Sequence, residues 1–251
     1  RNKKKNLNNL KYCNSYLKKK NFDVIINLSA ITDVDKCEKN LFEAKKINYE
    51  LVKNISSCIV KKKLNSFLIQ LSTDQFYSRF KKNNEKYQKL INNYSKTKYN
   101  AEKQALKTNA IILRTNFFGK SKTKKRNSFS DWIVKSLKSK NKINLADDIL
   151  FSPLSIDSLC KIIILVIEKQ INGIYNIGSK KGFSKYQFGI RLAKKLNLDI
   201  SLINKVFYKD IKFYAKRNRD MRMKLKNFEK KFKYKFRDLN FELNKVVKDY
   251  N

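Results

Sequence analysis

The sequence contains no histidine among its 251 residues. This absence excludes Ser-His-Asp and Cys-His nucleophile systems, H-E-x-x-H metal sites and any histidine general base. An enzyme of this composition must therefore move protons through Tyr, Lys, Asp, Glu or Cys side chains. The four cysteines lie far apart and form no C-x-x-C pair, so the sequence indicates neither a disulfide framework nor a zinc site. We expect no bound metal.

Long apolar runs are also missing. The longest, IIILVI at residues 162–167, is far shorter than the roughly 18 residues of a membrane-spanning helix. No apolar signal-peptide core stands near the start of the chain. We therefore expect a cytoplasmic protein without a membrane partner.

Negative charge is scarce: the sequence has 21 Asp and Glu residues and 59 Lys and Arg residues, which gives a formal net charge of +38. Such an excess invites a nucleic-acid hypothesis. However, lysine far outnumbers arginine and is spread along the whole chain, together with abundant asparagine and isoleucine. An AT-rich coding sequence produces that composition without selection for a binding face. Since sequence-specific readers favour the bidentate arginine fork, we expect no specific nucleic-acid partner, only nonspecific binding at low salt.

Glycine is the next shortage, with five residues and none before Gly119. A dinucleotide-binding α/β domain normally opens with a strand, a Gly-rich turn and a helix whose N-terminus holds the pyrophosphate. No such turn is present, and the first strand that we predict, at residues 22–28, has the character of a later strand of such a sheet. We interpret the missing βαβ unit as a truncation, because Arg1 is not a natural start.

Three short, continuously apolar runs are present, at residues 22–30, 66–73 and 110–115. Their apolar residues do not alternate with polar ones, which is typical of strands buried on both faces of a parallel sheet. Two helical patterns lie between these runs, at residues 41–59 and 94–107. The alternation predicts an α/β protein with a Rossmann-like, doubly wound parallel sheet.

The remainder of the chain predicts a second, smaller portion. We expect residues 1–155 to form the Rossmann-like domain, incomplete at its N-terminus, and residues 156–251 to form most of a substrate-binding portion interleaved with it. The elements expected beyond Gly119 are a helix at 129–137, a strand at 143–146, an apolar helix capped by Ser155 or Asp157, a strand at 173–178, a helix capped by Ser184 and a helix from about residue 241.

One pair of residues suggests catalysis. Tyr94 and Lys98 are four residues apart in a predicted helix, so they share a face. A lysine cation near a tyrosine favours the phenolate and lowers its pKa. Thr73 ends a predicted strand, where parallel sheets present residues to a ligand. With 13 tyrosines and many lysines, the same spacing also arises by chance on a solvated helix face.

The order of the surrounding motifs resembles that of the extended short-chain dehydrogenases/reductases, and within them the dTDP-4-dehydrorhamnose reductase group. The similar segments follow the family's order between about residues 20 and 232. They are VIINLSAITDVDKCE, LSTDQFY, NNYSKTKYNAE, ILRTNFFG, NLADDILFSPLSIDSL, GIYNIGSKKGFSKYQF and AKRNRDMRMKLKNFEKKF.

This resemblance implies an enzyme that reduces the 4-keto group of a nucleotide-linked deoxysugar with NADPH or NADH. By the same resemblance, Tyr94 is the general acid, Lys98 lowers its pKa and holds the nicotinamide ribose, and Thr73 hydrogen-bonds the substrate oxygen. The remaining residues that it assigns are Ser29, Ala30, Ile31 and Asn48 for the cofactor, and Thr32, Val34, Asp74, Gln75 and Phe117 for the substrate.

Departures from the family pattern keep other hypotheses open. Ser95 and Ala101 replace glycines, and Gln75 replaces an aromatic residue. Asn48 is equally well interpreted as an amide on a helix surface. A different sugar-nucleotide reductase or epimerase on the same fold is one alternative, and a non-catalytic relative that binds a sugar nucleotide or a protein is another. A homodimer is compatible with each of them.

Overall fold

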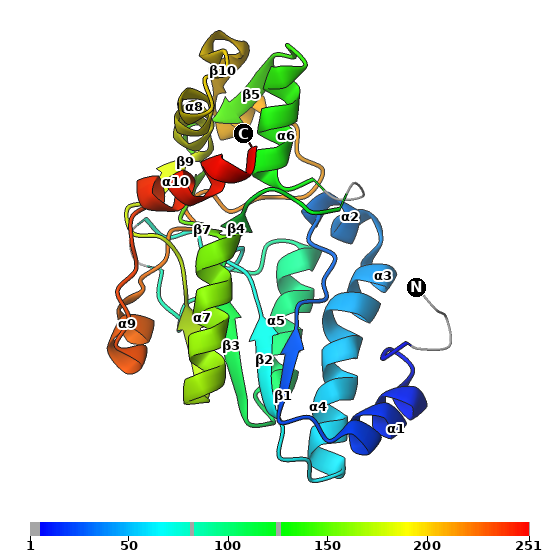
Figure 1. Cartoon of the computed structure of the whole chain (residues 1–251). Helices are drawn as coiled ribbons and strands as arrows, with labels where there is room; N and C mark the ends of the chain where they lie inside the picture. Colours follow the sequence, from blue (N-terminus) through cyan, green and yellow to red (C-terminus); the bar gives the residue numbers. More distant parts are fainter. Residues whose placement is uncertain (1–5, 81–82, 124–126, 251) are drawn as a thin grey trace.

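A parallel sheet forms the centre of the computed structural model, which describes residues 6–80, 83–123 and 127–250 (Figure 1). All neighbouring pairs of its four strands run parallel. The strand order is β1 (Val24–Asn27), β2 (Phe67–Leu71), β3 (Ala110–Arg114) and β8 (Gly173–Asn176). The predicted α/β class is thereby confirmed.

Helices cover both faces of this sheet. Successive side chains of a strand point to opposite faces: Leu68 packs in a cluster with residues of the first group of helices, whereas Ile69 packs with the second group. The first group comprises α1 (Leu10–Lys20), α4 (Leu51–Lys61) and α5 (Asn93–Ala105), and the second comprises α7 (Ile156–Lys169) and α9 (Lys226–Phe232). The sheet is therefore doubly wound, as predicted.

The strand β1 is shorter and more exposed than predicted. Strands β2 and β3 are buried throughout, whereas the Ile26 side chain in β1 is 40% exposed. Within the described residues β1 pairs with β2 alone and forms one edge of the sheet. The prediction of burial on both faces is thus wrong for β1, because an apolar run does not reveal a strand's place in the sheet.

The long helix predicted at residues 41–59 is present but interrupted. It consists of α3 (Leu41–Lys45), one π-helical turn (Lys46–Glu50) and α4, and α2 (Val34–Lys39) precedes it. A π turn inside a helix adds a residue to the turn and is frequent at functional sites. Here it contains Asn48, whose side chain points into the protein.

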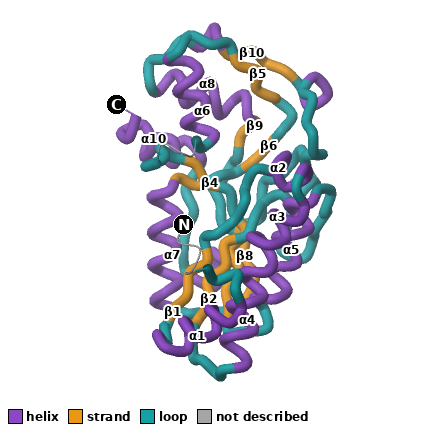
Figure 2. Tube along the Cα trace, turned by 90° about the vertical axis from the view of Figure 1, so that its right-hand side faces the viewer, coloured by secondary structure: helices purple, strands orange, loops and turns teal. Residues whose placement is uncertain are grey.

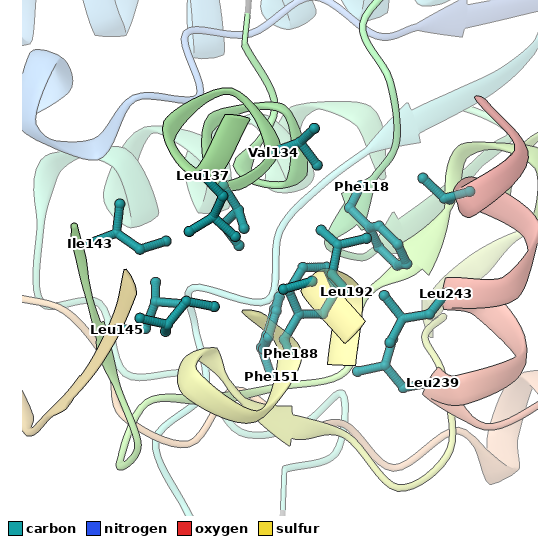
Figure 3. Close-up of a cluster of buried hydrophobic side chains, with 14 of the residues drawn as sticks. Phe118, Val134, Leu137, Ile143, Leu145, Phe151, Phe188, Leu192, Leu239 and Leu243 are labelled. Carbon is teal, nitrogen blue, oxygen red and sulfur yellow. The ribbon is translucent and has the colours of Figure 1, made fainter. Parts of the chain in front are cut away.

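A second hydrophobic core lies beyond the carboxyl ends of the sheet strands (Figures 1 and 3). Phe118 and Phe188 meet edge to face in it, with ring centroids 4.9 Å apart, and Leu192, Leu239 and Leu243 pack nearby. The elements that supply this core include α6 (Phe129–Lys138), β5 (Ile143–Ala146), α8 (Lys185–Lys195), β10 (Ile203–Val206) and α10 (Leu239–Tyr250).

Short strand pairs connect the two cores (Figure 2). The pairs are β4 (Phe117–Phe118) with β7 (Leu154–Ser155), and β6 (Leu150–Phe151) with β9 (Phe183–Ser184). Ser155 and Ser184 cap α7 and α8 by accepting from backbone N–H groups, as the sequence predicts. The chain therefore crosses repeatedly between the sheet and the outer layer, and a ligand site can form where they meet.

Candidate active site

Thr73 and Tyr94 come together at the carboxyl end of β2. Thr73 follows that strand, and Tyr94 lies in the first turn of α5. The start of α5 is fixed by a capping box, in which the Asn92 side chain accepts from Ser95 N at 2.8 Å. Both Thr73 and Tyr94 are buried, and their side chains are hydrogen-bonded. The predicted strand-end threonine and helix tyrosine are therefore neighbours.

The pKa of Tyr94 moves opposite to the expected direction. Burial raises the pKa of its phenol above its ordinary value, the hydrogen bond with Thr73 offsets part of that rise, and the nearby charge of Asp74 adds to it. The expected lowering by Lys98 is wrong for the structure as described. A phenol with a raised pKa stays protonated at neutral pH, so Tyr94 is a hydrogen-bond and proton donor.

Lys98 lies one turn after Tyr94 on α5 and is buried. Its ammonium donates to the carbonyl oxygen of Leu71, the last residue of β2, at 2.6 Å. Burial lowers the pKa of Lys98 to about 8, while the Glu102 carboxylate acts in the opposite direction. At neutral pH the side chain is still mainly cationic, so a positive charge lies beside the carboxyl end of β2.

Asn48 holds the loop after β1. Its Oδ1 accepts from Ile31 N at 2.8 Å, and its Nδ2 donates to Ile31 O at 3.1 Å and to Thr97 Oγ1 at 3.3 Å. The side chain is 1% exposed, so the alternative interpretation as a surface amide is wrong. Asn48 therefore fixes the loop containing Ser29 and Ala30 relative to the helix that carries Tyr94.

We expect Asn48→Ala to lower the free energy of unfolding by about 1–3 kcal/mol, because buried groups of Ile31 and Thr97 lose their hydrogen-bond partner. Urea unfolding measures the change. Asn109→Ala is the matched control, since that asparagine is exposed, and we expect a change within about 0.5 kcal/mol. Equal effects of the two substitutions would contradict the bridging role of Asn48.

A buried ion pair joins α5 to the end of β3. Arg114 Nη2 lies 2.6 Å from Glu102 Oε2, with both side chains at most 1% exposed. Arg114 Nε donates to Glu102 Oε1 at 3.0 Å, and Ser72 Oγ donates to the same oxygen. Ser72 immediately precedes Thr73, so Glu102 links the helix of Tyr94 and Lys98 to both strand ends around them.

A cavity of about 440 Å³ is lined by Gln75, two residues after Thr73, and by residues of the outer layer, whereas Thr73, Tyr94 and Lys98 do not line it. Of the residues predicted to contact substrate, only Gln75 lines it. Its Oε1 is buried and has no hydrogen-bond partner among the described residues. The side chains most relevant to ligand chemistry are Gln75, Phe129, Trp132, Lys185, Arg217 and Met221.

The other predicted substrate residues do not line the cavity. Thr32 is exposed, and Val34 packs with Ile31 against the cluster that contains Tyr94. Asp74 is buried and accepts from Asn116 Nδ2 at 3.0 Å. Phe117 is 44% exposed.

The two cations that line the cavity, Lys185 and Arg217, were not predicted from the sequence as site residues. Lys185 begins α8, and Arg217 lies in the segment between η3 (Tyr208–Asp210) and α9. Both lie in segments that carry the family resemblance, GFSKYQF and AKRNRDMRM. That context was the available signal, because neither residue stands out by spacing or periodicity.

Asp74 is buried and Lys185 is half-buried, and the pKa values of these two neighbouring charges are shifted toward each other. Burial raises the pKa of Asp74 to about 6, and the Asn116 hydrogen bond and the Lys185 charge oppose that rise. Burial lowers the pKa of Lys185 to about 8, against the charge of Asp74. Between these two values, both groups are mainly ionised.

This arrangement predicts a pH-dependent contribution of Asp74 to stability. Relative to Asp74→Asn, the free energy of unfolding of the wild type should fall as pH rises from about 4 to about 6, by about 3 kcal/mol. The folded state holds the proton in this window, since the pKa is raised from 3.8 to about 6. The stabilising contribution of protonated Asp74 is complete below its pKa of 3.8 in the unfolded state, and it is lost as pH rises through its pKa of about 6 in the folded state. Urea unfolding at several pH values tests this, and a constant difference between the proteins would contradict it.

Among residues 6–80, 83–123 and 127–250, no group of three or more His, Cys, Asp or Glu side chains is placed to hold a metal ion. No helix in the same ranges has the length and apolar character needed to span a membrane.

Known proteins resemble this chain in sequence. The model of the family described as RmlD substrate binding domain matches residues 1–251. A dTDP-4-dehydrorhamnose reductase from Aggregatibacter actinomycetemcomitans is 26% identical over 212 residues, which cover 78% of this chain and 70% of that protein.

Solved structures share the fold. A dTDP-4-dehydrorhamnose reductase from Bacillus anthracis in complex with NADP superposes with a TM-score of 0.90 and 20% identity, covering 97% of this chain and 86% of its own. A dTDP-glucose 4,6-dehydratase from Streptomyces venezuelae with NAD bound has a TM-score of 0.79 and 19% identity, covering 98% and 77% of the two chains. The Rossmann-like architecture is thereby confirmed.

Proposed function

The chain belongs to the RmlD substrate binding domain family, and we propose that it reduces the 4-keto group of a nucleotide-linked deoxysugar with NADPH or NADH. The observation that carries the proposal is the convergence of Thr73, Tyr94 and Lys98 at the end of β2, two residues before Gln75, which lines a cavity of substrate size. The name of the reductase relative supports the same reaction.

Tyr94 is proposed as the general acid. Its raised pKa keeps the phenol protonated, so it donates a proton to the carbonyl oxygen as that oxygen gains negative charge. Thr73, already hydrogen-bonded to Tyr94, orients the same oxygen. Lys98 contributes a buried positive charge at the carboxyl end of β2, where its ammonium donates to the carbonyl oxygen of Leu71.

NADPH or NADH, when bound, supplies the hydride for this reduction. The residues at the ends of β1 and β2 fit the nicotinamide half, because the loop of Ser29 and Ala30 presents small side chains and is fixed in place by Asn48. Lys98 lies at the adjacent strand end as a hydrogen-bond donor for a ribose. The sequence contains no Gly-rich turn for the pyrophosphate.

The outer layer is proposed as the substrate-binding portion. It carries Lys185 and Arg217 among the residues that line the cavity. Its core is supplied about equally by elements before residue 156, such as α6 and β5, and by elements after it, such as α8, β10 and α10, while α7 and β8 return to the sheet. Location in the cytoplasm and a homodimeric state stay predictions, which cell fractionation and sedimentation can test.

The reaction is tested by supplying dTDP-4-dehydrorhamnose with NADPH or NADH and following the loss of the reduced nicotinamide by absorbance. The 251-residue chain and any longer form that its gene encodes are assayed in parallel. We expect stoichiometric oxidation of cofactor and formation of a 4-hydroxy sugar nucleotide. Conversion of sugar nucleotide without net cofactor oxidation would instead favour an epimerase or dehydratase, and binding without conversion a non-catalytic relative.

A further inference from the structure

Lys185 is a half-buried cation that the reduction chemistry leaves without a role. It is the first residue of α8, and its side chain lines the cavity. The ammonium lies over two aromatic rings, 3.3 Å from the Phe151 centroid and 4.3 Å from the Phe129 centroid. Within the described part of the chain, no hydrogen-bond acceptor and no ion-pair partner within 4 Å is found for it. A cation in such surroundings favours an anionic ligand.

The second cation of the cavity is already engaged. Arg217 Nη2 forms an ion pair with Asp35 Oδ1 at 3.0 Å, and its Nη1 donates to Ala215 O at 3.2 Å. The carboxylate nearest to Lys185 is that of Asp74, which accepts from Asn116. Among the described residues, Arg217 is therefore held by two protein contacts, whereas all three donors of the Lys185 ammonium are left for a ligand.

We propose that Lys185 binds the diphosphate of the nucleotide sugar and thereby selects for this substrate class. The inference rests on the proposed function. In a dTDP-linked 4-keto deoxysugar, the keto sugar, the deoxyribose and the thymine base are neutral. The diphosphate is therefore the group that carries negative charge. An ammonium donates up to three hydrogen bonds, and those to phosphate oxygens are charge-assisted.

The other lining residues fit the neutral parts of such a ligand. Phe129 and Trp132 stack on each other with centroids 6.0 Å apart at 20°, and the Trp132 side chain is 40% exposed, so a planar base can extend the stack. The unpartnered Oε1 of Gln75 is an acceptor for a sugar hydroxyl on the side nearest Thr73. Cationic, aromatic and amide side chains thus line the same cavity.

Calorimetric titration with dTDP and with thymidine tests the assignment. Lys185→Met removes the charge but keeps an unbranched apolar side chain, and we expect it to weaken dTDP binding about tenfold or more while thymidine binding stays unchanged. Lys185→Arg keeps a cation and should stay within about threefold of wild type. Lys194→Met, at an exposed position of the same helix, is the matched control and should have no effect.

The outcomes separate this inference from the function on which it rests. Wild-type protein that binds no dTDP would overturn both the sugar-nucleotide function and the role of Lys185. Tight dTDP binding that is unchanged by Lys185→Met would overturn the role of Lys185 alone. If that variant does not fold, the wild type still decides, since equal affinities for thymidine and dTDP would contradict any cation on the diphosphate. A loss confined to NADPH binding would place the cofactor at Lys185 and also overturn the assignment.

Discussion

Replacing Tyr94 by phenylalanine should lower turnover of the keto sugar about 100- to 10,000-fold and leave substrate affinity nearly unchanged. The substitution removes the one phenolic proton donor that is hydrogen-bonded to Thr73, and it keeps the ring that packs with Cys37 and Ala44. The pKa of Tyr94 is raised, so Lys98 loses its proton first, near its pKa of about 8. We therefore expect the wild-type rate to decline first near pH 8 and attribute that decline to Lys98.

Tyr99→Phe is the matched control for this substitution. Tyr99 lies on the same helix, but its ring packs against Phe76 at a centroid distance of 6.0 Å. Steady-state kinetics of the two variants, with substrate binding measured separately, distinguishes proton donation from helix packing. Equal rates for Tyr94→Phe and wild type would remove Tyr94 from the reaction, and a loss of binding without a loss of rate would make it a substrate contact.

Removing the Glu102 carboxylate should have the largest effect on stability, about 3–5 kcal/mol for Glu102→Ala. Arg114 is fully buried, and loss of its partner leaves an uncompensated charge in the interior. Ser72 loses its acceptor in the same substitution. Since α5 is attached to the end of β3 through this carboxylate, the variant should also displace Tyr94 relative to Thr73.

A double-mutant cycle identifies the cause. Replacing both partners, Glu102→Met with Arg114→Met, should recover part of the lost stability, because no unpaired charge remains. Glu43→Ala removes half of an exposed pair, Lys36 with Glu43 at 3.9 Å, and should change stability by less than about 1 kcal/mol. Chemical unfolding is measured for the wild type, the two single methionine variants, the double variant and Glu43→Ala. Additive effects of the two methionine substitutions would show that the pair contributes through packing alone.

Local sequence patterns were sufficient for most secondary-structure elements. The apolar runs at β2 and β3 predicted buried strands, and Ser155 and Ser184 predicted the starts of α7 and α8. Each of these features depends on residues that are close in sequence. The exposure of Ile26 in β1 was not predictable, because it depends on what pairs with the strand and not on the strand's own composition.

Features that depend on long-range packing were predicted less completely. The spacing of Tyr94 and Lys98 correctly placed both on one helix, yet the direction of the Tyr94 pKa shift depends on burial, which spacing does not report. Asn48 could not be separated from a surface amide until its bonds to the loop of Ile31 were known. Lys185 and Gln75 line the same cavity only because residues far apart in the chain fold together.

Isotope labelling tests most directly whether the protein transfers a hydride from the nicotinamide to C4 of the sugar. Keto sugar nucleotide is incubated with the protein and with NADPH or NADH that carries deuterium at the transferable position of the nicotinamide, and the product is examined by NMR. We expect one deuterium at C4 of the sugar with the wild-type protein, and no label at C4 with Tyr94→Phe at equal protein concentration. A 4-hydroxy product without deuterium at C4, or unchanged keto sugar with wild-type protein in its longest encoded form, would contradict it.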